Sequence, residues 1–104
     1  MVRVSFMYPT KKRGRFDMDY YSTTHAALVR ETLNDPGFVR FEIDQGLGGA
    51  KPDAPPTYVA IGHMIFTNTN AFQRLMQQHG RSLNADVPNF TNISAVIQVS
   101  GMVA

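Results

Sequence analysis

Two histidines are the first candidates for chemistry in this 104-residue chain, because imidazole is the side chain best suited to move protons near neutral pH. His25 lies on the apolar stripe of a predicted helix, one turn after Tyr21. His63 lies in a predicted strand, on the same face as Val59 and Ile61. A helix packed on a sheet could bring both imidazoles to one cleft. The alternative is that each is a core histidine with one hydrogen-bond partner.

Asp86 is the carboxylate that could act with these histidines. It could orient an imidazole, act as a base itself or cap a turn, which is a common role for Asp ahead of a Val-Pro-Asn segment. Tyr8 and Tyr21 offer phenol donors, and Tyr21 shares a helix face with His25, whereas Tyr20 points elsewhere. The candidate catalytic residues are therefore His25 and Asp86, and the candidate ligand contacts are Tyr8, Tyr21, His63 and Phe90.

The sequence lacks the residues and motifs that several other classes of chemistry require. The chain has no cysteine, which excludes disulfides, thiolate catalysis and cysteine metal sites. It has no Gly-x-Ser-x-Gly elbow and no glycine pattern that would cradle a phosphate before a helix. It also has no His-x-x-x-His or Glu-x-x-His pair. We therefore expect neither a metal nor a bound nucleotide, flavin or other cofactor.

Charge and hydropathy narrow the class of protein further. The net charge of +2 is too small to indicate a nucleic-acid surface. Half of the basic residues fall within the first fifteen positions. Four of these five lie in a predicted loop over 9–15, which is either solvated or steers an anion towards a cleft. No apolar run approaches the roughly 18 residues of a membrane span, and the first residues are typical of a strand, not of a signal peptide. We expect a cytoplasmic protein that binds neither nucleic acid nor a membrane.

Hydrophobic periodicity predicts six elements in a single domain over residues 1–104. Alternating apolar residues predict strands over 2–8, 38–45, 58–67 and 93–99. Helical spacing predicts helices over 17–33 and 69–79, the second ending at His79 with Gly80 as its cap. A further helical turn is expected within 81–87. The order β-α-β-β-α-β is typical of the ferredoxin-like α+β fold, in which two helices cover one face of a four-stranded antiparallel sheet.

The other face of this sheet is predicted to need a cover. The strand over 58–67 is apolar on both faces, and no further element of the chain remains to pack on the open side. A second subunit, packed sheet against sheet, is the simplest cover, so we expect a homodimer.

Three motifs identify a family resemblance that spans nearly the whole chain. They are FDMDYYSTTH over 16–25, YVAIGH over 58–63 and DVPNFTNI over 86–93. The chain resembles the EthD family of dimeric α+β barrel proteins. The resemblance implies a homodimer whose sheets face each other and a small cleft in each subunit, with the first-helix histidine at that cleft. Where family members often read His-x-Pro-Leu, this chain has alanine at position 27, which predicts a straighter helix beside the cleft.

The resemblance implies little about the reaction. EthD itself is associated with an ether-degrading monooxygenase system, and related barrels include polyketide cyclases, lactone isomerases and cofactor-free monooxygenases. The first hypothesis is a cofactor-free enzyme that performs isomerase-, cyclase- or monooxygenase-type proton transfer on a small apolar or aromatic metabolite. The alternative is an accessory or binding protein for a partner oxygenase in ether or aromatic degradation. A structural dimer with a vestigial cleft is a third possibility.

Overall fold

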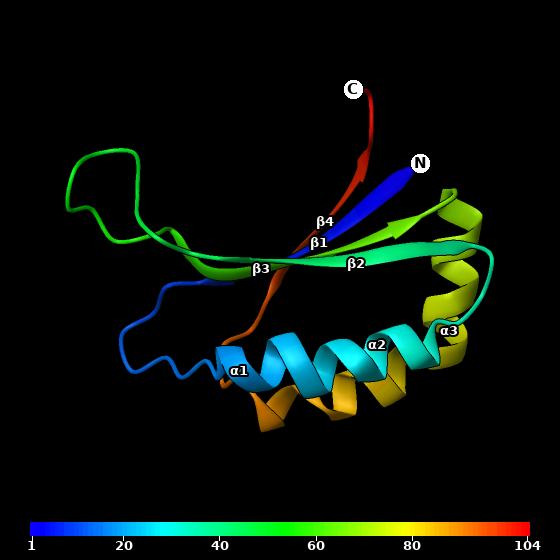
Figure 1. Cartoon of the computed structure of the whole chain (residues 1–104), viewed down its shortest axis with the longest axis horizontal. Helices are drawn as coiled ribbons and strands as arrows, with labels where there is room; N and C mark the ends of the chain where they lie inside the picture. The colour runs from blue at the N-terminus through cyan, green and yellow to red at the C-terminus, as the bar shows by residue number, and fades with distance from the viewer.

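The predicted ferredoxin-like order is confirmed by the computed structural model, which describes all 104 residues (Figure 1). Four strands form one antiparallel sheet in the order β2-β3-β1-β4. The strands are β1 (Val2–Pro9), β2 (Phe38–Gln45), β3 (Tyr58–Phe66) and β4 (Val96–Gly101). The helical segments are α1 (Met18–Tyr20), η1 (Tyr21–His25), α2 (Ala26–Thr32), α3 (Thr69–Ala85) and η2 (Val87–Asn89). No helix has the length and apolar character that crossing a bilayer would need.

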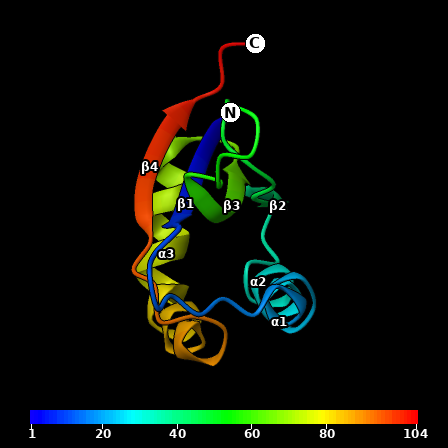
Figure 2. The same ribbon diagram turned by 90° about the vertical axis from the view of Figure 1, so that its left-hand side faces the viewer.

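The two faces of the sheet differ because alternate residues of a strand point to opposite sides. Val4 pairs with Met64 across the β1–β3 ladder, and both are buried in the core beneath the helices. Ser5 and His63 form the next pair along this ladder and therefore point to the opposite face. The helices lie on one side of the sheet (Figures 1 and 2), so this opposite face is the open one.

The first helix is not the uninterrupted α-helix that we expected over 17–33. Asp17 caps its start by accepting a hydrogen bond from the Tyr20 N–H at 3.0 Å, and the α-helical pattern then gives way to a π turn, η1. The N–H of Ala26 bonds to the carbonyl of Tyr21, five residues earlier. The absence of proline at position 27 has therefore not produced an uninterrupted α-helix beside the sheet. Such π turns are frequent at functional sites.

The second helix is longer than the sequence predicted. Asn68 caps the start of α3 through the Ala71 N–H at 2.8 Å, but the helix continues past His79 and Gly80 to Ala85. The predicted glycine cap at position 80 is wrong. Glycine inside a helix costs only about 1 kcal/mol relative to alanine, and burial of Leu83 on the stripe that begins with Leu75 outweighs that cost.

The segment that follows α3 is tied to the chain before α1. The Asp17 N–H donates to the Phe90 carbonyl at 2.7 Å, and the Arg15 N–H donates to the Asn92 side chain at 2.7 Å. The Arg15 guanidinium also donates to the Pro88 carbonyl at 3.1 Å. These bonds hold residues 88–92 out of the sheet, so β4 begins at Val96 and not at the predicted position 93. They also place Asp86 beside the first helix.

Candidate functional site

A cavity of about 270 Å³ lies between the sheet and the helices. Most of its wall is apolar, contributed by the helix-facing sides of β1, β2 and β3 and by α3. The lining residues are Phe6, Tyr8, Tyr21, His25, Phe41, Met64, Phe72, Met76, Gly80, Leu83, Asn84, Val87 and Ile97. A shallower depression beside it shares five of these residues and reaches the segment before β4. The cavity therefore has the apolar wall and few polar groups that are typical of small-ligand sites.

His25 and Asp86 form a hydrogen-bonded pair at the wall of this cavity. The Nδ1 atom of His25 lies 2.8 Å from Oδ2 of Asp86, and the histidine is only 5% exposed. Nε2 of His25 has no hydrogen-bond partner in the protein, yet it is not enclosed, because Arg3 Nε is the only fully buried side-chain nitrogen or oxygen without a partner. The carboxylate fixes the proton on Nδ1 and leaves the Nε2 lone pair free.

Three donors surround the Asp86 carboxylate. In addition to His25, the Tyr20 hydroxyl donates to Oδ1 at 2.6 Å and the Asn89 amide donates to the same oxygen at 2.9 Å. Burial alone would raise the pKa of Asp86, but these hydrogen bonds outweigh it and hold the pKa below its ordinary value. Asp86 is therefore ionised near neutral pH and acts on the imidazole as a fixed negative charge.

The π turn explains why Tyr20 and His25 reach the same carboxylate. Residues five apart in an α-helix lie about 140° from each other around the axis, so Tyr20 and His25 would point apart. A π turn has more residues per turn and closes this angle. Tyr21 and His25 are four residues apart and share one face in either kind of helix, and their rings stack with a 5.4 Å separation and a 16° interplanar angle. The prediction that Tyr20 points elsewhere rested on α-helical spacing and missed this residue.

Two neutral phenols face the cavity together with the imidazole. Burial raises the pKa of Tyr8 to about 12, partly opposed by a hydrogen bond from Tyr21. Burial, and the neighbouring Tyr8 phenol, raise the pKa of Tyr21 as well. Both groups are therefore hydrogen-bond donors at any physiological pH and cannot serve as phenolate bases.

Gly62 of β3 makes room for the Tyr21 hydroxyl. A Cβ at this position would collide with Tyr21 Oη and come within 3.1 Å of the Phe41 ring. In the sequence analysis this glycine was noted only as part of the YVAIGH motif. The structure shows that it leaves room for the Tyr21 hydroxyl. The phenol of the first helix rests directly on the backbone of the sheet.

We expect Gly62→Ala to destabilise the protein by about 1–3 kcal/mol, because the added methyl group must displace a packed phenol. Urea unfolding measures the change. Gly101→Ala in β4 is the matched control, since a Cβ there meets nothing within 4 Å, and its effect should stay within about 0.5 kcal/mol. Equal effects of the two substitutions would contradict the role assigned to Gly62.

Comparison with known proteins decides the family. The EthD domain model matches residues 15–94 of the chain. The chain belongs to the EthD family. No functionally curated protein matches it.

Solved structures share the ferredoxin-like fold of this EthD protein. An EthD-like protein from Ralstonia eutropha JMP134 is 32% identical, with a TM-score of 0.93 over 99% of this chain and 92% of that chain. An ethyl tert-butyl ether d (EthD) family protein from Bacillus halodurans C-125 is 18% identical, with a TM-score of 0.73 over 99% of each chain. A mutant of SnoaB, described as a cofactor-independent oxygenase from Streptomyces nogalater, is 17% identical, with a TM-score of 0.58 over 99% of this chain and 92% of that chain.

Not every residue predicted for the EthD site reaches the cavity. His25, Tyr21 and Tyr8 line it, and Asp86 stands directly behind the imidazole. Phe90 does not line the cavity, because it is fully buried behind the His25 ring at a 4.6 Å centroid distance. Phe90 packs against the imidazole, so the structure does not place it among the residues that line the cavity, and its assignment as a ligand contact stays a prediction.

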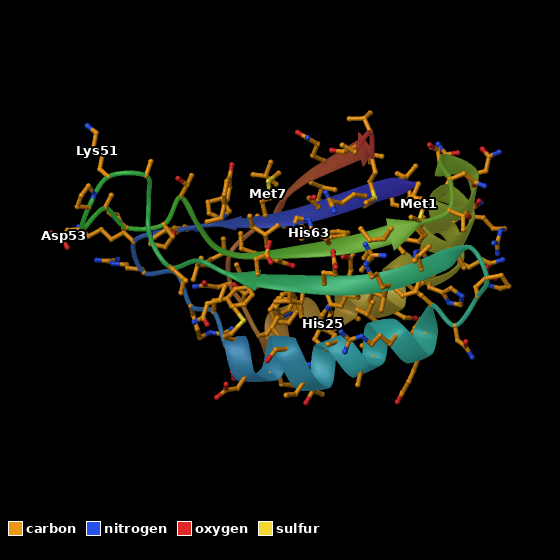
Figure 3. The ribbon with its side chains drawn as sticks, turned by 45° about the horizontal axis from the view of Figure 1, so that its top comes forward. Met1, Met7, His25, Lys51, Asp53 and His63 are labelled. Atoms are coloured by element: carbon orange, nitrogen blue, oxygen red, sulfur yellow. The ribbon has the colours of Figure 1, made fainter.

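His63 lies on the opposite face of the sheet from His25 (Figure 3). There its Nδ1 meets the Ser5 hydroxyl at 2.9 Å and its Nε2 meets Asp44 at 3.0 Å. The expectation that both histidines share one cleft is therefore wrong, since Gly62 and Met64 are the residues of β3 that face the helices. No three His, Asp or Glu side chains converge in a way that could hold a metal ion.

Two lining residues of α3 were missed by the sequence reading. Gly80 lacks a side chain where a Cβ would meet nothing within 4 Å, and it thereby widens the cavity. Asn84 supplies a polar group one turn further along. Both residues lie on the same side of α3 as Met76 and Leu83. They were missed because the sequence predicted that this helix ends at His79, before either residue.

Proposed function

We propose that this EthD protein is a cofactor-free enzyme that moves a proton on a small apolar or aromatic metabolite. The observation that carries the proposal is the free Nε2 atom of His25, which lines an otherwise mostly apolar cavity while Nδ1 is held by Asp86. A neutral imidazole in this tautomer is a general base. The ionised carboxylate behind it favours the imidazolium that forms after proton transfer.

The cavity supports a restricted class of ligand. Its volume of about 270 Å³ lies just below the roughly 300–1,000 Å³ of typical ligand pockets, so a small ring system fits and a large cofactor does not. Once the imidazole has taken a proton, it can return that proton to another atom of the same ligand. Isomerisation and cyclisation need no oxidant and no further group. The SnoaB description supports the idea that this fold can host chemistry without a cofactor.

Deuterium exchange into a ketone probe tests the proposal. The probe is 2-tetralone, a small bicyclic ketone with acidic C–H bonds beside its carbonyl, dissolved in buffered deuterium oxide. We expect the protein to accelerate exchange above the buffer rate, as measured by proton NMR. Gly80→Leu should abolish the acceleration, because its side chain would fill the cavity. Binding of 2-tetralone without accelerated exchange would instead favour the alternative, an accessory protein that holds a metabolite for a partner oxygenase.

The open face of the sheet supports a homodimer as part of this proposal. Ile61, Met7 and Val59 remain partly exposed there, and the buried Arg3 Nε on this face has no partner within the chain. Contact between two such faces at the usual interface size buries about 1,600 Å² in total.

We expect light scattering at micromolar concentration to give twice the chain mass of 11.6 kDa. Met7→Arg should yield the monomer, because it places an unpaired charge on this face between Ile61 and Val96, its apolar cross-strand neighbours. Leu47→Arg is the matched control, since Leu47 is 92% exposed in the loop between β2 and β3, and it should leave the mass unchanged. A wild-type mass of one chain would contradict the dimer.

A further inference from the structure

The polar groups of the cavity restrict its ligand more than its size does. Only four lining side chains carry a polar atom, namely Tyr8, Tyr21, His25 and Asn84, and none carries a fixed charge. No lysine or arginine lines the cavity, and the Asp86 carboxylate lies behind its wall, hydrogen-bonded to His25. A ligand with a permanent negative charge would lose its hydration without gaining a cation. The bound form of the ligand is therefore neutral.

The two phenols are held differently at the cavity. Gly62 lets the Tyr21 hydroxyl rest on the backbone of the sheet, and the Tyr8 and Tyr21 rings meet edge to face at 5.7 Å. Tyr8 lines both the cavity and the shallower depression beside it, whereas Tyr21 lines the cavity alone. Burial keeps Tyr8 in its neutral form, which carries a hydroxyl hydrogen. Tyr8 is therefore the phenol placed to donate a hydrogen bond to a ligand.

The geometry points to a neutral carbonyl compound as the substrate, with Tyr8 as the hydrogen-bond donor to its oxygen and His25 as the base for the adjacent C–H. This inference rests on the proposed function. The C–H bond breaks, its proton goes to Nε2, and its electron pair forms a C=C bond. The carbonyl π pair moves to the oxygen, which becomes an enolate oxygen that accepts the Tyr8 hydrogen bond. Return of the proton from His25 to the same or another carbon restores the neutral imidazole.

The arrangement suits this step because base and donor act on different atoms. His25 presents a lone pair and no hydrogen at Nε2, whereas Tyr8 presents a hydrogen and stays neutral. Preorganised donors aimed at an oxygen that gains negative charge are worth about 10²- to 10³-fold in rate each. Enolate formation uses both groups, whereas covalent catalysis by a hydroxyl or thiol would need a serine, threonine or cysteine, and the cavity wall has none.

Three probes of one shape test the oxygen site by fluorescence titration. 2-Naphthol mimics the enol of 2-tetralone, naphthalene lacks the oxygen, and 2-naphthoate carries a permanent charge. We expect 2-naphthol to bind about tenfold more tightly than naphthalene, in line with one buried hydrogen bond, and 2-naphthoate to bind more weakly than 2-naphthol. Tyr8→Phe should remove the preference for 2-naphthol over naphthalene, whereas His25→Gln should preserve it.

Equal binding of naphthalene and 2-naphthol, or tighter binding of 2-naphthoate, would overturn the assignment. So would a preference that survives Tyr8→Phe and disappears in His25→Gln, because the oxygen would then lie on the imidazole. The two proposals fail separately. Exchange of 2-tetralone without a Tyr8-dependent preference would leave His25 as the base and remove the role of Tyr8. A Tyr8-dependent preference without exchange would leave an oxygen site in a binding protein.

Discussion

Replacing His25 by glutamine should lower the exchange of 2-tetralone by about 10²- to 10⁴-fold, the usual contribution of a general base. Glutamine can still donate an amide hydrogen to Asp86, but it has no basic lone pair to offer the cavity. The fold should therefore persist while the rate collapses. NMR gives the exchange rate, and urea unfolding shows whether the variant remains folded. A packing role for His25 would produce the reverse, a loss of about 1–3 kcal/mol in stability with exchange intact.

His63→Gln is the matched control for this substitution. It makes the same chemical change in the same protein, but on the opposite face of the sheet, where Ser5 and Asp44 are the partners of the imidazole. Exchange in this variant should match the wild-type rate. A comparable loss in both variants would show that the assay reports general damage and not proton transfer at the cavity.

The pairing of His25 with Asp86 was within reach of the sequence. His25 falls on the apolar stripe of its helix, where a side chain of this polarity requires a partner, and Asp86 was one of the carboxylates that could orient an imidazole. The order of strands and helices also followed directly from hydrophobic periodicity. What the sequence could not supply was the distance between these two segments, which the bonds from Arg15 and Asp17 to residues 88–92 determine.

The error at His63 has a simple physical source. β3 is apolar on both faces, so its alternation does not reveal which set of residues meets the helices. The glycine determines which face of β3 meets the helices, because Gly62 is the position at which the sheet has room for the Tyr21 phenol. Because alternate residues of a strand face opposite sides, an error of one residue in this assignment exchanges the two faces, and it placed His63 in the cavity instead of on the open face.

The π turn was equally hidden. No proline, glycine or cap marks residues 21–25, and the pattern of apolar residues fits an α-helix well. The extra residue in the turn is compensated by tertiary contacts, namely the Tyr20 and His25 bonds to Asp86 and the stacking of Tyr21 on His25. Local sequence carries little information about such contacts.

Replacing Asp86 by asparagine should lower exchange by about 10²-fold or more through the tautomer of His25. Tyr20 and Asn89 both donate to Oδ1, so the carbonyl oxygen of the new amide is retained at that position. Its NH₂ group then faces His25 Nδ1, which must accept instead of donate. The imidazole hydrogen moves to Nε2, and the cavity loses its base. The ¹⁵N chemical shifts of His25 report this change of tautomer directly.

Asp35→Asn is the control, because Asp35 pairs with Arg74 at 3.0 Å, away from the cavity, and loses the same charge without touching the site. Its exchange rate should match the wild type. Exchange in Asp86→Asn above a tenth of the wild-type rate, with Nδ1 still protonated, would contradict the positioning role.

The pH dependence of stability gives an independent readout for Asp86. Its pKa in the folded protein lies below the ordinary value of about 3.9, so the unfolded chain takes up the proton first as the pH falls. The stabilisation from the ionised carboxylate is therefore complete above about pH 4 and is lost as the pH falls through the lower folded pKa. The difference in unfolding free energy between the wild type and Asp86→Asn should be constant near neutral pH and should shrink below about pH 4. A difference that stays constant to the acid limit would show that the carboxylate is not held in its charged form by Tyr20, His25 and Asn89.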